Sequence, residues 1–376
     1  MTLLYTYAMQ LTIKPETKAA EAFDIIIDYA VTHGASDVHI DPESGSLAVR
    51  MRIDGVLTHC VTVSSSLHTE MIARIKVLAR LRPDIHLLAQ DGRFSYAERS
   101  FGASVDMRVS IIPTHFGENA VIRILAGGRR TTNLSSLGFS PDDEAVVREA
   151  LTRNQGMILV TGPTGSGKTS TMYAMLRELV REPLSIVTLE DPIEYAIEGI
   201  RQIAVDHRHG INFGNGLRSL VRQDPDVIMV GEIRDKETAQ IATNIALTGH
   251  LIISTLHTSD ALGSVTRLND LGIDPYLVAH TLSVVIAQRL VRTLCIDCDG
   301  MGCSRCFQSG YRGRTIIAEV LEIDDELRAY IAARMPMVEI SRHARLKGMI
   351  SMRDHAAEKV EWGATTLEEV KRVLDL

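Results

Sequence analysis

The 376-residue sequence contains no run of 18 or more apolar residues, so it predicts no transmembrane helix. Its first residues show no basic region followed by an apolar stretch, and we therefore expect no signal peptide. Basic residues are not in excess either, since the formal net charge is -7 and the pI is about 6.0. This balance argues against a large nucleic-acid-binding surface. Together these absences predict a cytoplasmic protein that reaches a membrane only through a partner.

Internal repeats and low-complexity tracts are also absent from the sequence. The composition, with 45% hydrophobic and 23% charged residues, is that of an ordinary globular protein with a packed core. The length leaves room for two or three domains of roughly 100–200 residues each.

Cysteine is scarce, but four of the five cysteines lie within Cys295–Cys306. In a chain without an export signal, such a cluster favours a metal site over disulfides. The fifth, Cys60, stands apart, and we expect it to be a small buried hydrophobic residue.

The first 125 residues predict one small α+β domain. Residues 15–34 have helical periodicity and end at His33-Gly34, and residues 69–82 return to a helical pattern. Ser46–Ile53 and Ser104–Ile112 alternate as half-buried strands do. The polar, glycine-containing segment Ala126–Asn133 follows and indicates an interdomain linker.

Beyond this segment the pattern changes. Short, almost entirely apolar runs alternate with helical stretches, which predicts buried parallel strands with helices on both faces. The runs are Met157–Thr161, Ser185–Leu189, Val227–Val230 and Leu251–Thr255. Two long helical stretches are expected to close the chain.

A glycine-rich segment, Gly162–Thr169, fits the pattern G-x-x-x-x-G-K-[ST] and lies between an expected strand and an expected helix, Ser170–Val180. Its glycines would let backbone N–H groups turn inward around a phosphate, and the helix would add the positive end of its dipole. Lys168 would reach the β- and γ-phosphates of ATP, and Thr169 would bind Mg²⁺. A flexible glycine turn is the alternative. The predicted nucleotide-binding residues are Gly162, Pro163, Thr164, Gly165, Ser166, Gly167, Lys168, Thr169 and Ser170.

Hydrolysis also requires acids near the phosphates, and two apolar strands end in one. Glu190 and Glu232 each follow such a strand, and parallel strands bind ligands beyond their carboxyl ends. We assign Glu232 as the residue that polarises water, with Glu190 supporting it through Mg²⁺-bound water, although the two roles could be exchanged. Each alone could be an ordinary solvated loop residue.

His257 ends a further apolar strand. A neutral imidazole there could sense the γ-phosphate or orient water. A histidine hydrogen-bonded to the backbone at a strand end is an equal alternative.

Four blocks now stand in order: Gly162–Thr169, Thr188–Glu194, Arg222–Asp235 and Gly249–Thr258. They closely resemble the Walker A motif, Asp box, atypical Walker B motif and His box of the type II/type IV secretion ATPases. Segments of the first domain, Gly34–Pro42, Arg50–Gly55, Gln90–Phe94 and Asp106–Glu118, resemble that family too.

The resemblance implies a homohexamer in which each subunit has an N-terminal PAS-like domain and a RecA-like ATPase domain. It also implies that arginines of the first domain reach the nucleotide, and the candidates are Arg93, Arg108 and Arg123. Arginine suits this task because its planar fork binds phosphate in two places. Each could instead form a surface ion pair.

The cysteine pairs Cys295/Cys298 and Cys303/Cys306 supply the ligands of a structural Zn²⁺ site. Two disulfides or an iron–sulfur cluster are the alternatives. The pairs are only four residues apart, a shorter spacing than in secretion members of the family, and Gly300 and Gly302 would permit the tight turn. A tetracysteine element after Gln288–Leu290 resembles the assembly ATPases more than the retraction motors.

The resemblance therefore predicts a motor that drives assembly of a type IV pilus or pseudopilus through a polytopic inner-membrane platform protein. The short N-terminal part resembles the competence-pilus ATPases, which serve DNA uptake. A retraction or conjugative secretion ATPase, a DNA translocase with a RecA-like core, and a non-hydrolysing scaffold are the competing hypotheses. No direct nucleic-acid binding is expected.

The expected domains are a PAS-like domain at residues 1–128, a linker at 129–138 and a RecA-like ATPase domain at 139–376. The last would include the tetracysteine element at 291–318 and a helical part at 319–376.

Overall fold

A computed structural model describes residues 11–14, 16–97, 104–125, 133–180 and 183–374. Their contacts divide the chain into two units. Unit 1 comprises the N-terminal part up to Arg130 together with Cys295–Gly313, and unit 2 comprises the rest. Most of the expected linker segment, Ala126–Asn133, lies outside the described residues. The grouping of Cys295–Gly313 with unit 1 differs from the expected limits, and the domain limits stay a prediction.

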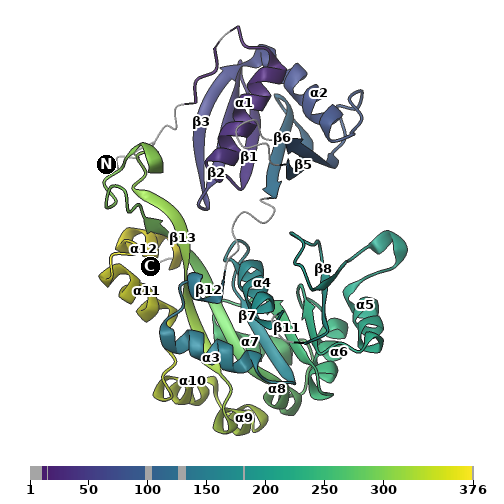
Figure 1. The fold of residues 1–376 in the computed structure, drawn as a ribbon, viewed down its shortest axis with the longest axis vertical. Helices are drawn as coiled ribbons and strands as arrows, with labels where there is room; N and C mark the ends of the chain where they lie inside the picture. Colours follow the sequence, from purple (N-terminus) through teal and green to yellow (C-terminus); the bar gives the residue numbers. More distant parts are fainter. Residues whose placement is uncertain (1–10, 15, 98–103, 126–132, 181–182, 375–376) are drawn as a thin grey trace. The chain divides into compact units, whose positions relative to one another are not determined.

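Unit 1 is a six-stranded antiparallel sheet with two helices against one face (Figure 1). The strand order is β3-β2-β1-β6-β5-β4. Phe23 and Ile27 of the first helix and Met71 of the second are buried against alternate strand residues, which gives the sheet one apolar face. The elements are α1 (Ala19–Thr32), β1 (Asp37–Glu43), β2 (Ser46–Ile53), β3 (Val56–Ser64), α2 (His68–Leu78), β4 (Gln90–Ala97), β5 (Ser104–Thr114) and β6 (Gly117–Leu125).

These elements confirm the two helices and two strands expected from the sequence. Cys60 is buried as predicted, and burial raises the pKa of its thiol to about 11.

Unit 2 is built on a seven-stranded sheet in the order β13-β12-β7-β11-β10-β8-β9. Its strands are β7 (Gly156–Thr161), β8 (Ile186–Glu190), β9 (Arg201–Ala204), β10 (Val227–Val230), β11 (Leu251–Leu256), β12 (Leu282–Leu294) and β13 (Tyr311–Glu322). Each neighbouring pair of strands from β12 to β9 is parallel. The four apolar runs recognised in the sequence are therefore confirmed as β7, β8, β10 and β11.

Both faces of this sheet are buried, as the continuous apolar runs predict. Met157 and Leu159 point into one core and Ile158 and Val160 into the other, so neighbouring residues of one strand serve opposite faces. The second core includes α3 (Pro141–Leu151) and α4 (Lys168–Leu179). The first core includes residues of α5 (Phe213–Leu220), α6 (Lys236–Leu247), α7 (Ala261–Asp270) and α8 (Pro275–Thr281).

The expectation of two long helical stretches at the end of the chain is wrong. Four short helices occupy this region (Figure 1): α9 (Asp325–Ala332), α10 (Met337–Leu346), α11 (Met352–Glu361) and α12 (Leu367–Leu374). Pro336 precedes α10, and Gly348 and Gly363 adopt φ of 101° and 69° just after α10 and α11. A left-handed glycine after a helix ends it, which helical periodicity alone does not reveal.

Candidate functional site

The predicted phosphate-binding loop lies between the carboxyl end of β7 and the first turn of α4. Gly167 is the N-cap of α4 with φ of 89°, and Gly162 has φ of 143°, both in the region that favours glycine. Lys168 Nζ donates hydrogen bonds to the carbonyl oxygens of Gly162 at 2.8 Å and Pro163 at 3.0 Å. The lysine thus folds back over the loop whose amides would hold an anion.

Charges from two other strands act on Lys168. Burial lowers the pKa of its ammonium group, the carboxylate of Glu232 opposes this shift, and the guanidinium of Arg289 adds to it. The loop, the end of β10 and the middle of β12 therefore share one electrostatic environment. Arg289 also donates to the carbonyl oxygen of Ser259, at 3.3 Å.

The loop residues fit a bound nucleotide. The hydroxyl of Ser166 is buried and has no hydrogen-bond partner among the described residues. A buried hydroxyl without a partner is unfavourable, and a phosphate oxygen in the loop could supply the partner. Thr169 follows Lys168 in the first turn of α4, where its hydroxyl could bind Mg²⁺ next to those phosphates.

The end of β10 presents a partly buried acid whose partners are exposed. Glu232 Oε2 accepts a hydrogen bond from Arg234 Nε at 2.5 Å and lies 3.3 Å from Nε2 of the half-exposed His257. The backbone is fixed on both sides, because Gly231 N donates to Leu189 O and Ile233 N donates to Thr255 O. Glu232 and His257, which were predicted separately, are thus brought together, and Glu232 acts on Lys168.

The end of β8 holds its acid quite differently. Glu190 is 3% exposed, and its carboxylate accepts hydrogen bonds from the hydroxyls of Tyr173 and Thr188 and, at 3.0 Å, from Gln202 Nε2. Burial and this carboxylate together raise the pKa of the Tyr173 hydroxyl, which keeps its proton. Glu190 is therefore enclosed by donors from α4, β8 and β9.

Sequence reasoning missed several of these partners. Tyr173 lies in α4 five residues after Lys168, on the helix face toward β8, and Gln202 lies in β9, a strand that was not anticipated. Gln288 and Arg289 lie in β12, which was also not anticipated as a strand. The apolar run of β12 was a usable signal, but nothing in the sequence indicates that it lies beside β7.

The four clustered cysteines converge as predicted. Their sulfur atoms all lie within 4.8 Å of one another, and the closest is the pair Cys303 Sγ and Cys306 Sγ at 3.7 Å. Gly300 and Gly302 have φ of 80° and 96°, which allows the tight turn between the pairs.

Backbone amides help to set the sulfur chemistry of this cluster. Burial raises the pKa of the Cys295 thiol to about 12. Burial also acts on Cys306, but the Cys303 N–H, at 3.1 Å from its sulfur, and other hydrogen bonds lower its pKa to about 7. Four thiols at these distances fit a tetrahedral zinc ion.

The three first-domain arginines form one row across the sheet of unit 1. Arg93 pairs with Arg108 between β4 and β5, and Arg108 pairs with Arg123 between β5 and β6. Directly opposed residues of antiparallel strands project to the same face. The row continues to Asp37, which accepts from Arg123 Nε at 3.0 Å, and to Arg52, two residues the sequence analysis did not single out.

Comparison with known proteins adds to this geometry. Residues 15–372 match the family described as type II/IV secretion system protein. This match spans almost the whole chain.

The chain belongs to the type II/IV secretion system protein family.

Its relatives in the family include characterised proteins. The chain is 44% identical over 369 residues to the "Type II secretion system ATPase E" of Vibrio cholerae, covering 92% of this chain and 73% of the relative. It is 40% identical over 382 residues to the "Type IV pilus assembly ATPase PilB" of Thermus thermophilus, covering 94% of this chain and 43% of the relative. Among solved structures, the Legionella pneumophila ATPase DotB superposes with a TM-score of 0.76 at 23% identity, over 97% of this chain and 98% of that one.

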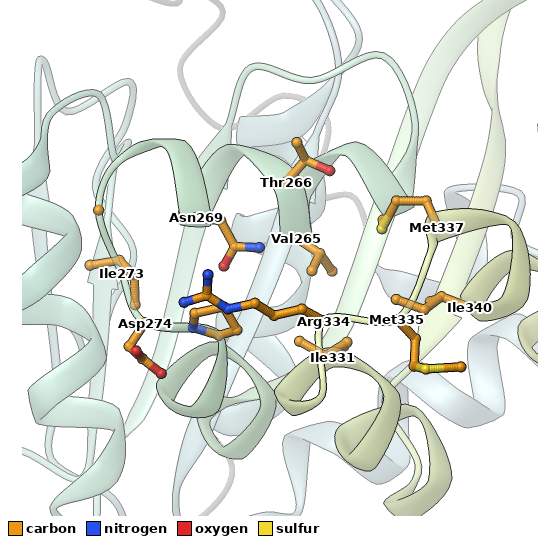
Figure 2. Close-up of a pocket in the computed structure, with 12 residues that line it drawn as sticks. Val265, Thr266, Asn269, Ile273, Asp274, Ile331, Arg334, Met335, Met337 and Ile340 are labelled. Atoms are coloured by element: carbon orange, nitrogen blue, oxygen red, sulfur yellow. The ribbon is translucent and has the colours of Figure 1, made fainter.

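This type II/IV secretion system protein also carries a groove in unit 2 (Figure 2). Its volume is about 480 Å³, and its lining is mixed, with Val265, Ile331 and Met337 among the apolar residues. Arg334 reaches across it between Asn269 and Asp274. None of the residues predicted to bind nucleotide lines this groove.

Proposed function

We propose that this chain is a motor ATPase that couples ATP hydrolysis to assembly of a type IV pilus or pseudopilus, in type II secretion or in competence DNA uptake. The observation that carries the proposal is the joint placement of Lys168 and Glu232. The lysine sits over a glycine-rich anion loop, and the carboxylate is close enough to act on its pKa. A scaffold that only binds nucleotide would not need this acid.

Each site residue then has a distinct task. The loop amides and Lys168 bind the phosphates, and Glu232 polarises the attacking water. Thr169 would hold Mg²⁺, which neutralises charge on the phosphate oxygens when bound. His257, 3.3 Å from Glu232, orients that carboxylate or the water. Glu190 supports the site from its buried position.

The architecture supports a RecA-like ATPase domain preceded by a PAS-like domain. In unit 2 two strands, β11 and β10, separate the loop strand β7 from β8, the next strand in sequence. In unit 1 the arginines Arg93, Arg108 and Arg123 stand side by side, an arrangement that is unfavourable unless an anion or acid offsets the like charges. In the working homohexamer these arginines reach a nucleotide, and ATP binding and hydrolysis alternately engage and release them.

A structural zinc ion, held by Cys295, Cys298, Cys303 and Cys306, completes the proposed protein. Four thiolates leave the metal no open position, so its role is folding and not catalysis. The tetracysteine element supports the assembly branch over the retraction branch, because the family resemblance places such an element in assembly motors.

The proposed location is the cytoplasm, at the inner face of the membrane. No helix among the described residues is long and apolar enough to span a bilayer. A polytopic platform protein of the inner membrane is the proposed partner that receives the motion. Direct binding of nucleic acid is not part of this function.

Phosphate release by the purified chain with Mg-ATP tests the proposal. We expect steady turnover that Lys168→Ala abolishes, from a species with the mass of six copies in light scattering. Addition of DNA should leave the rate unchanged.

Two results would contradict the proposal. A wild-type protein that binds ATP without releasing phosphate would identify a scaffold. Turnover that rises with DNA, together with DNA binding that weakens steeply with salt, would identify a translocase.

A further inference from the structure

Gln288 of β12 is a buried residue that the site description leaves without a role. Its side chain is completely shielded from solvent. Its Nε2 donates to the carbonyl oxygen of Ser166 at 2.8 Å, and its Oε1 accepts from Thr171 Oγ1 at 2.8 Å. One side chain thus connects the phosphate-binding loop with α4 from a strand more than a hundred residues away in sequence.

The carbonyl oxygen of Ser166 fixes which way the amide points, because a carbonyl can only accept a hydrogen bond. The NH₂ group of Gln288 therefore faces Ser166, and Oε1 faces the buried hydroxyl of Thr171, which donates to it. Were the amide reversed, two acceptors would meet at Ser166. Thr171 thus holds the other end of the amide in the orientation in which Gln288 can hold the loop.

Gln288 also lies against both ends of the loop. A Cβ added to Gly162 would come within 2.5 Å of the Gln288 carbonyl oxygen, and one added to Gly167 within 3.2 Å of its Nε2. The glycines thus allow β12 to approach the loop closely, in addition to providing positive φ.

The bond to Ser166 has a consequence for phosphate binding. A trans peptide is planar, so the carbonyl of Ser166 and the N–H of Gly167 point in opposite directions. Because Gln288 holds the carbonyl on the outer side of the loop, the Gly167 N–H is directed to the inner side. In an anion-binding loop it is this inward N–H that contacts phosphate.

We propose that Gln288 is a positioning residue for nucleotide binding, which holds the Ser166–Gly167 peptide with its N–H directed at the phosphates. The inference rests on the proposed function, because it requires that the loop bind nucleotide. Gln288 itself touches no nucleotide. It acts through the loop backbone, and Thr171 acts through Gln288.

The test compares Gln288→Leu with wild type and with Thr243→Val. Thr243 is a matched control, since its buried hydroxyl donates one hydrogen bond, to Ala239 O at 2.8 Å, within α6. Dissociation constants for Mg-ADP and for a non-hydrolysable ATP analogue are measured by calorimetry, with kcat, KM and the unfolding temperature without nucleotide.

We expect Gln288→Leu to raise both dissociation constants and KM about tenfold, which corresponds to the loss of one hydrogen bond to phosphate worth about 1.4 kcal/mol. The value of kcat should change much less. Thr243→Val should lower the unfolding temperature and leave both dissociation constants unchanged. A Gln288→Leu protein with wild-type affinity and a lowered unfolding temperature would show that the glutamine only stabilises the fold, and would overturn the inference.

Thr171 gives an independent test that does not depend on the folding of Gln288→Leu. Thr171→Val removes the anchor and should weaken nucleotide binding, whereas Thr171→Ser keeps the hydroxyl and should bind as wild type does. The double variant Gln288→Leu/Thr171→Val should bind nucleotide no more weakly than Gln288→Leu alone, since Thr171 acts on the loop only through Gln288. Equal affinities for the valine and serine variants would contradict the inference.

The two proposals fail in different ways. If wild type binds no nucleotide, the proposed function is wrong. If wild type binds and hydrolyses ATP while the Gln288 and Thr171 variants match it, only the positioning role is wrong.

Discussion

The carboxyl ends of β8 and β10 are adjacent in the sheet, yet they hold their acids in opposite ways. Glu190 is buried and its carboxylate accepts from three side-chain donors, whereas Glu232 contacts a half-exposed histidine and an exposed arginine. Of these two acids, Glu232 is the one that acts on the pKa of Lys168.

The difference shows that a strand-end acid is not a functional assignment by itself. A carboxylate that already accepts from three donors has few acceptor positions left for a water. Glu232, whose partners Arg234 and His257 are themselves exposed, has more. The surroundings thus favour Glu232 as the acid that polarises water, and the following predictions test this comparison from the largest effect to the smallest.

Glu232→Gln should have the largest effect on turnover. Loss of a general base typically lowers kcat by about 10²–10⁴-fold, and an amide cannot accept the proton. ATP binding should remain, because the loop and Lys168 are unchanged. Single-turnover phosphate release and nucleotide titration measure the two effects separately. Turnover close to wild type would reverse the assignment of the two acids.

Glu190→Gln should instead affect stability more than chemistry. The amide NH₂ would face groups that donate hydrogen bonds to the carboxylate, at a cost of about 1–3 kcal/mol in the free energy of unfolding. Urea titration measures this cost, and Tyr173→Phe, which removes one donor, should cost less. A Glu190→Gln variant that is as stable as wild type but loses as much turnover as Glu232→Gln would contradict the different roles assigned to the two acids.

The alkaline fall of turnover with pH should reflect the ionisation of Lys168 and not that of Tyr173. Burial lowers the pKa of Lys168, so its positive charge is lost as pH rises through a value below that of a free lysine. Bound phosphates restore the charged form. We therefore expect the alkaline fall of kcat/KM, which reflects free protein, at lower pH than the fall of kcat.

Tyr173→Phe provides the control for this profile. The pKa of Tyr173 is raised, so its removal should leave both alkaline limbs in place. If kcat/KM and kcat of the wild-type protein fall at the same alkaline pH, nucleotide binding does not change the ionisation of Lys168.

Of these changes, loss of a cysteine ligand should have the smallest effect on turnover at the strand ends. Cys298→Ser removes one of four zinc ligands, so bound zinc and thermal stability should fall. Metal analysis should find one zinc per wild-type chain, and the kcat of the folded variant should stay close to wild type. A folded variant with wild-type zinc content would argue against the site, and a loss of turnover like that of Glu232→Gln would link the metal to the chemistry.

Much of this protein follows from local sequence. The strands β7, β8, β10 and β11 are continuous apolar runs, and a run buried on both faces needs no partner to be recognised. The loop is equally local, because its glycines, its lysine and the following helix are consecutive in the chain. The same holds for Cys295–Cys306, whose spacing alone places the sulfur atoms together.

Helix ends and strand partners were less predictable. The C-terminal helices α10 and α11 end just before Gly348 and Gly363, which adopt positive φ, and helical periodicity alone does not reveal such ends. Strand β12 was missed although its apolar run was a usable signal, and nothing in the sequence indicates that it lies beside β7, where it brings Gln288 to the loop.

The sequence by itself determined which residues could do the chemistry: the loop, Lys168, Thr169, the two acids and His257. It could not rank the acids, since Glu190 and Glu232 each follow an apolar strand. The tertiary structure favours Glu232, because Tyr173 of α4 and Gln202 of β9 enclose Glu190, whereas His257, just after β11, and Lys168 lie near Glu232. These partners lie far from the two acids in the chain, so only the packing of the strands and helices brings them together.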